Sequence, residues 1–200
     1  GYRTSNEDAH LITGAPFLEN SHVLMAIFDG HAGKGTSVFA REHLAETLSE
    51  TKGYKNYVKS KANKVHETDT DEEVRMIRSG LSDAFIALDK KLLDLQMKGG
   101  GDGSGSTCSC AVVSPSHIYS AWVGDSRCNV GIANGGTLAM TDDHKPENKA
   151  EMRRIMRADG FVLDNRVDGQ LAMSRALGDF QYKLNKSIPL DEQKVTCIPD

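Results

Sequence analysis

The chain has 200 residues, a hydrophobic content of 38% and a net charge of −4, values that are typical of a soluble globular protein. A slightly acidic chain has no general electrostatic reason to bind nucleic acid or a membrane surface, and no apolar run approaches the roughly 18 residues of a membrane-spanning helix. We therefore expect no nucleic-acid partner and no membrane segment, and a chain long enough for a domain that buries roughly 70% of its unfolded surface.

Two strands are expected near the N-terminus, over residues 8–14 and 22–28. The second contains six consecutive apolar residues, VLMAIF, which indicate a strand buried on both faces. A helix is predicted over residues 34–50, where alanine and leucine recur at i, i+4 spacing.

A lysine-rich segment follows at residues 52–64. Lysines interspersed with Tyr54 and Tyr57 could form a nucleic-acid-binding patch. The segment is short, however, and the acidic stretch at residues 66–73 offsets its charge, so a solvated connector is the favoured interpretation.

The strongest predicted helix begins after Thr70. Thr70 and Glu73 have the spacing of a capping box, and the acidic residues between them suit the positive end of the helix dipole. Apolar residues at three-to-four spacing then predict one core-facing stripe. It consists of Val74, Ile77, Leu81, Phe85, Leu88, Leu92 and Leu95.

The second half begins with a glycine-rich segment at residues 99–106, predicted to be a flexible loop. Three short strands and one helix are then expected, at residues 107–113, 117–123, 127–133 and 147–158. Gly160 is predicted to end that helix as a left-handed cap. Strands and helices that are grouped in this way, rather than alternating, indicate an α+β fold with antiparallel sheets.

The four cysteines lack CxxC spacing and are predicted to be buried free thiols of an intracellular protein, cytoplasmic or nuclear. Recognisable sequence features begin directly at residue 1, and residues 198–200 provide no closing element. Both observations suggest that the two ends of the domain are truncated. We therefore expect residues 1–200 to form a single, truncated domain.

Several acidic residues lie where strands are expected to end. Asp29, followed by Gly30 and His31, ends the strand over residues 22–28, and Asp125 lies in a turn between later strands. Carboxylates and free carbonyls are the ligands that Mg²⁺ and Mn²⁺ prefer, and zinc is less suited to them. Taken singly, each residue has an equally good explanation as an ordinary turn or edge residue.

Other phosphate-related motifs are absent. The stretch GHAGKGTS lacks the first glycine of a P-loop, and Lys34 is followed by Gly35 instead of serine or threonine. No cysteine has an arginine six residues later, which excludes the nucleophile of cysteine-dependent phosphatases. The segment at residues 69–73 is better explained by helix capping than by calcium binding.

Six segments, in order along nearly the whole chain, resemble the metal-dependent type 2C protein serine/threonine phosphatases. They are R…NEDAH (3–10), LMAIFDGHAG (24–33), SGST (104–107), WVGDSR (122–127), DDHKP (142–146) and RVDGQLAMSRALGDFQYK (166–183). The resemblance implies two packed, mostly antiparallel sheets flanked by helices, a four-layer αββα sandwich, with the C-terminal part missing from this chain. It implies a catalytic domain that acts on phosphoprotein substrates, which we expect to be a monomer.

The resemblance also implies a metal centre. Asp29 would bridge two Mn²⁺ or Mg²⁺ ions, the carbonyl of Gly30 would bind one of them, and Glu7 and Asp8 would hold metal-bound waters. Asp125 would help to bind a third, weaker ion. A hydroxide that bridges the two ions would attack phosphorus directly, without a phosphoenzyme.

Two further residues receive roles from the resemblance. Arg3 would bind two phosphate oxygens through its planar guanidinium group. His31 would act as the general acid that protonates the leaving serine or threonine oxygen. The SRALGD stretch, the glycine-rich loop and DHKP are expected to be scaffold, with Arg175 and Asp179 forming an i, i+4 pair if their segment is helical.

The chain departs from the family pattern in two ways. Asn6 stands where methionine is usual, a change expected to be harmless. Two further aspartates of the family would lie beyond residue 200, so these 200 residues alone are expected to bind the second metal poorly and to have little activity. The alternative for the parent protein is a catalytically inactive relative that acts as a regulatory or binding module.

Overall fold

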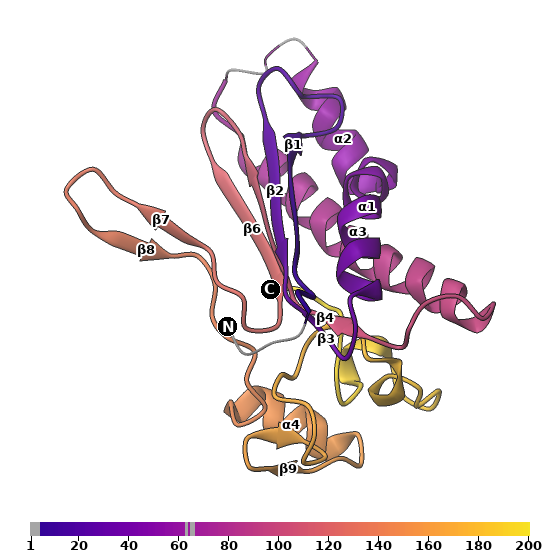
Figure 1. The fold of residues 1–200 in the computed structure, drawn as a ribbon. Helices are drawn as coiled ribbons and strands as arrows, with labels where there is room; N and C mark the ends of the chain where they lie inside the picture. The colour runs from indigo at the N-terminus through magenta and orange to yellow at the C-terminus, as the bar shows by residue number, and fades with distance from the viewer. Residues whose placement is uncertain (1–4, 63, 65–66) are drawn as a thin grey trace.

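A computed structural model describes residues 5–62, 64 and 67–200. Its main element is an antiparallel sheet with the strand order β1-β2-β5-β6 (Figure 1). The strands are β1 (Ala9–Gly14), β2 (Val23–Phe28), β5 (Cys108–Val113) and β6 (Ile118–Val123). Each strand pairs with its neighbour in antiparallel register, as the sequence predicts.

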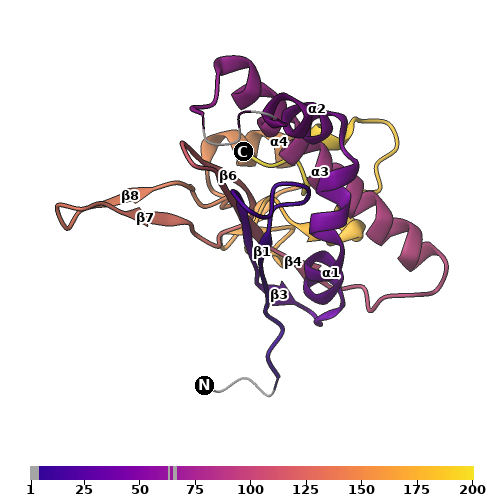
Figure 2. The ribbon, with the colours of Figure 1, turned by 90° about the horizontal axis from the view of Figure 1, so that it is seen from above.

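The strand β2 is buried on one face only, so the prediction of burial on both faces is wrong. Its burial alternates along the strand: Leu24, Ala26 and Phe28 are buried, whereas Val23, Met25 and Ile27 are exposed. The buried side chains face the helices, which cover one face of the sheet (Figure 2). Within the described residues, the opposite face of β2 stays open to solvent.

Three helices form the covering layer. They are α1 (Gly35–Glu50), α2 (Lys52–Lys61) and α3 (Asp71–Met97). The predicted capping box is confirmed: the backbone N–H of Glu73 donates to the Thr70 hydroxyl at 3.3 Å, and that of Thr70 donates to Glu73 Oε2 at 2.8 Å. Most of the predicted apolar stripe of α3 is buried in the main core, although Leu95 at its end is exposed.

The lysine-rich segment is the helix α2, so the prediction of a solvated connector is wrong. Tyr54, Tyr57 and Lys61 are buried. The Lys61 ammonium lies 2.5 Å from Asp69 Oδ1, and the Tyr57 hydroxyl donates to the same carboxylate at 3.1 Å. A lysine-rich sequence thus contributes a buried face because one of its lysines has a buried acidic partner.

Close contact between α2 and α3 depends on Gly53 and Gly80. A Cβ at Gly80 would lie 2.6 Å from the backbone nitrogen of Tyr54, and one at Gly53 would lie 2.5 Å from the carbonyl oxygen of Met76. We expect Gly80→Ala to lower the free energy of unfolding by about 1–3 kcal/mol, although alanine is the better helix former. Urea denaturation measures the free energy of unfolding, and Ser79→Ala on the exposed face of α3 is the control. If Gly80→Ala and Ser79→Ala were equally stable, the close contact between α2 and α3 would not depend on Gly80.

Smaller elements surround the end of the main sheet. A three-stranded sheet has the order β11-β4-β3, and β7 and β8 form a hairpin that projects away from the body (Figure 1). Their bounds are β3 (Gly30–His31), β4 (Gly105–Ser106), β7 (Asn129–Gly131), β8 (Thr137–Ala139) and β11 (Leu177–Gly178). The predicted glycine-rich loop therefore ends in a strand, and the predicted strand over residues 127–133 is shorter.

A second, smaller core lies below the sheet around α4 (Lys149–Arg157), β9 (Val162–Leu163) and β10 (Arg166–Val167). Two 3-10 turns, Phe180–Tyr182 and Leu190–Glu192, follow later in the chain. The helix α4 ends close to its predicted position, but Asp159, and not Gly160, takes the left-handed conformation, with φ of 60°.

These elements confirm the α+β class with antiparallel sheets flanked by helices. Cys108, Cys110 and Cys197 are buried free thiols, as predicted, and Cys128 is half-buried. Over the described residues, none of the helices combines the length and apolar character needed to cross a bilayer.

Candidate active site

Asp29 lies where β2 ends and β3 begins. Its backbone N–H donates to the hydroxyl of Thr107 at 3.0 Å, and the Thr107 N–H donates to the carbonyl of Asp29 at 3.0 Å. The Thr107 hydroxyl is also 2.7 Å from Ser126 Oγ. These bonds hold the end of β2 against the start of β5 and tie it to the turn that carries Asp125.

Two other predicted carboxylates, those of Asp8 and Asp125, act electrostatically on Asp29. Burial first, and then the negative charges of Asp8 and Asp125, raise the pKa of the Asp29 carboxyl, while nearby His31 lowers it. Three acidic side chains from separate segments thus repel one another, a situation that a bound cation relieves.

Glu7 approaches the same place through its backbone. The Ser37 hydroxyl donates to the carbonyl of Glu7 at 2.5 Å, and a Cβ on Gly30 would lie only 2.3 Å from that oxygen. A glycine is therefore required at position 30 because the N-terminal segment passes over it. The sequence analysis gave another reason for this glycine, the approach of a metal ion, which stays a prediction.

Lys145 is a site residue that the sequence analysis treated as scaffold. Its ammonium group forms an ion pair with the Asp125 carboxylate. Next to it, Arg127 makes a two-pronged pair with Asp143, with N–O distances of 2.7 and 2.9 Å. Lys145, Arg127 and Asp143 line a hollow of about 560 Å³. The sequence carries no local signal for this contact, because Lys145 and Asp125 are 20 positions apart.

His31 has an acidic partner, Asp179. His31 Nε2 lies 2.7 Å from Asp179 Oδ2. Burial lowers the pKa of His31, but the hydrogen bond and charge of Asp179, with the charges of Asp29 and Asp125, outweigh it and raise that pKa overall. The expected pair of Arg175 with Asp179 does not form, because the segment is the strand β11 and not a helix. Arg175 instead pairs with Glu151 and Asp200.

The remaining predicted residue, Arg3, lies outside the described residues. Within the part of the chain that the structure describes, no group of three or more His, Cys, Asp or Glu side chains is arranged to hold a metal ion. The donor chemistry nevertheless fits a hard divalent cation, since Asp8, Asp29 and Asp125 offer carboxylate oxygens and the charges of Asp8 and Asp125 act on Asp29.

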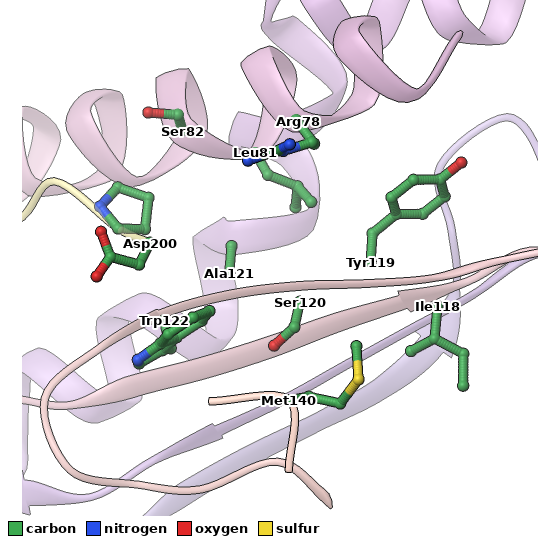
Figure 3. A pocket seen from close by; sticks show the side chains of 11 residues that line it. Arg78, Leu81, Ser82, Ile118, Tyr119, Ser120, Ala121, Trp122, Met140 and Asp200 are labelled. Carbon is green, nitrogen blue, oxygen red and sulfur yellow. The ribbon is translucent and has the colours of Figure 1, made fainter. Parts of the chain in front are cut away.

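A larger hollow, of about 620 Å³, lies elsewhere, between α3 and β6. Leu81 of α3 and Tyr119 and Trp122 of β6 line it (Figure 3). At one end, the backbone of Asp200 pairs with that of Trp122, with both N–O distances at 3.3 Å. None of the clustered carboxylates lines this hollow, so the candidate site stays at the end of β2.

Comparison with known proteins identifies the family of the chain. The family model described as protein phosphatase 2C matches residues 1–200. Probable protein phosphatase 2C 4 of Paramecium tetraurelia is 34% identical over 210 residues, which cover 100% of this chain and 63% of that protein. Protein phosphatase 1B of Mus musculus is 35% identical over 202 residues, which cover 100% of this chain and 50% of that protein.

Solved structures give the same result for the fold. A phosphatase from Toxoplasma gondii superposes with a TM-score of 0.75 at 26% identity, over 100% of this chain and 68% of that one. A serine-threonine phosphatase 2C from the same organism has a TM-score of 0.81 at 23% identity, over 100% and 69%. The chain spans between half and two thirds of the length of the curated relatives named above.

Proposed function

Because this chain belongs to the protein phosphatase 2C family, we propose that the protein removes phosphate from phosphoserine and phosphothreonine side chains of other proteins, with Mn²⁺ or Mg²⁺ as cofactor. The observation that carries the proposal is that the charges of Asp8 and Asp125 act on Asp29 at the end of β2, and that the charges of Asp29 and Asp125 act on His31.

The residues divide into those that hold the ions and those that act on the phosphoester. Asp29, Asp125 and the carbonyl of Gly30 would bind the ions, two of them with a weaker third, and Glu7 and Asp8 would support them through water. Bound divalent ions supply positive charge that activates water and neutralises the phosphate group.

The other residues act on the phosphoester itself. Arg3 would bind two phosphate oxygens and fix the orientation of the group. His31 would donate a proton to the serine or threonine oxygen as its bond to phosphorus breaks, since an alkoxide is a poor leaving group.

The test is hydrolysis of a phosphothreonine peptide and of p-nitrophenyl phosphate by the full-length protein. We expect turnover with Mn²⁺ or Mg²⁺ and a return to background after chelation, recovered by adding the metal again. Turnover that persists in excess chelator would overturn the metal-dependent mechanism. A folded protein that binds Mn²⁺ by calorimetry but hydrolyses neither substrate would instead support the regulatory or binding module.

A further inference from the structure

The small sheet β3-β4-β11 brings His31 and Asp179 together. Gly105 in the central strand pairs with His31 on one side and with Gly178 on the other. A Cβ on Gly105 would lie 2.3 Å from His31 Nε2 and 2.2 Å from Asp179 Oδ2. The missing side chain at this position therefore provides the space in which imidazole and carboxylate meet.

Asp179 is held in place from several sides. The residue is 3% exposed and has left-handed backbone angles, φ 51° and ψ 39°, which residues other than glycine, asparagine and aspartate seldom adopt. The preceding Gly178 donates its N–H to Asp89 Oδ1 at 2.8 Å. A buried carboxylate on a fixed backbone is a rigid acceptor for His31.

This contact leaves one imidazole nitrogen for chemistry. Because Nε2 lies 2.7 Å from the carboxylate of Asp179, it donates its proton there. Nδ1 of His31 makes no hydrogen bond to any described residue, although it is buried. A buried nitrogen without a partner is costly unless another group reaches it.

We propose, on the basis of the phosphatase function proposed above, that Asp179 is the positioning residue of His31. Asp179 holds the ring through Nε2 so that Nδ1 delivers the proton to the leaving oxygen. In that step the oxygen of an attacking hydroxide forms a bond to phosphorus and the phosphorus–oxygen bond of the phosphoester breaks. The electron pair of the broken bond stays on the serine or threonine oxygen, and the Nδ1 proton of imidazolium moves to that oxygen. The neutral ring keeps its Nε2 proton and its bond to Asp179.

Two substrates with different leaving groups can show whether Asp179 positions His31 or only stabilises the fold. Protonation matters greatly for an alkoxide and little for p-nitrophenolate, which leaves readily without a proton. Loss of a correctly placed acid therefore slows phosphopeptide hydrolysis selectively, whereas a distorted fold slows both substrates.

The experiment compares kcat and KM of full-length wild type, Asp179→Asn and Asp179→Gly on a phosphothreonine peptide and on p-nitrophenyl phosphate. Both replacements tolerate the left-handed backbone. We expect kcat on the peptide to fall by about 10- to 100-fold, within the contribution of a general acid, with KM nearly unchanged and p-nitrophenyl phosphate affected only slightly.

Asp89→Asn is the matched control. Asp89 is buried to a similar degree and accepts hydrogen bonds from Gly178 of β11 and from Lys183, but it is not bonded to His31. We expect this variant to lose stability and to keep the wild-type ratio of the two rates.

A double-mutant cycle and a proton NMR spectrum complete the test. If Asp179 acts through His31, adding Asp179→Asn to His31→Gln causes no further loss on the peptide. The proton NMR spectrum should show a downfield His31 Nε2–H signal that both single variants lose.

If the wild type is active and Asp179→Asn keeps the same ratio of peptide rate to p-nitrophenyl phosphate rate, this inference alone is overturned. A wild type inactive on both substrates overturns the proposed function and this inference with it.

Discussion

Asp29→Asn is expected to lower the metal-dependent phosphatase activity of the full-length protein by about 10²–10³-fold, the range measured when one pre-organised electrostatic group is removed from an active site. The charges of Asp8 and Asp125 both act on the Asp29 carboxylate. Asparagine keeps the size and one oxygen donor but removes the charge that balances the cations. The measurement is kcat on a phosphothreonine peptide over a range of Mn²⁺ concentrations.

The same variant should not be less stable without metal. Burial and the charges of Asp8 and Asp125 oppose ionisation of Asp29, so a neutral side chain relieves repulsion in the folded protein. In chelator, the melting temperature of Asp29→Asn should equal or exceed that of wild type, and added Mn²⁺ should stabilise it less. Asp94→Asn, on an exposed part of α3, is the control expected to behave as wild type.

Two results would contradict this assignment. One is an Asp29→Asn protein with unchanged activity. The other is loss of activity accompanied by an unfolded or strongly destabilised protein in chelator, since that would make Asp29 a structural residue.

Elements with a local signal were predictable from the sequence. The capping box at Thr70 and the apolar stripe of α3 are patterns within one helix, and both appear as expected. The one-sided burial of β2 was not predictable, because six apolar residues in a row are the same whether or not a second layer covers them. In α2, lysines dominate the composition, and the burial of Lys61 depends on Asp69, which lies beyond the end of the helix.

In the candidate site, too, residues with a local sequence signal were predictable and contacts made by tertiary structure were not. Asp29 and Asp125 could be found because each lies in a short motif at the end of a strand. The partners of His31 and Asp125 were missed. Asp179 is 148 positions from His31, and the prediction of an i, i+4 pair with Arg175 assumed a helix where the chain forms β11. Lys145 likewise meets Asp125 only through tertiary structure.

Asp69→Ala is expected to lower the free energy of unfolding by about 3–5 kcal/mol, the cost of breaking a buried ion pair on one side. The Asp69 carboxylate accepts hydrogen bonds from Tyr119 at 2.5 Å, Ser114 at 3.0 Å and Tyr57 at 3.1 Å, and its Oδ1 lies 2.5 Å from the Lys61 ammonium. Alanine leaves a buried charge and three hydroxyls without this acceptor. Replacing the pair with apolar residues, Lys61→Met with Asp69→Leu, should recover much of the loss.

The pH dependence of this difference identifies the charge as its cause. Burial raises the pKa of Asp69, but hydrogen bonds from Lys61, Tyr119 and Ser114 outweigh it and lower that pKa to about 2. Since the pKa is lower in the folded state than in the unfolded state, ionised Asp69 stabilises the protein above about pH 4, and the contribution disappears as the pH falls towards about 2. Urea denaturation of wild type and Asp69→Ala from pH 7 to pH 2.5 should show the two free energies of unfolding converging. A difference that stays constant over this range would mean that side-chain packing, and not the carboxylate charge, stabilises the contact between α2 and β6.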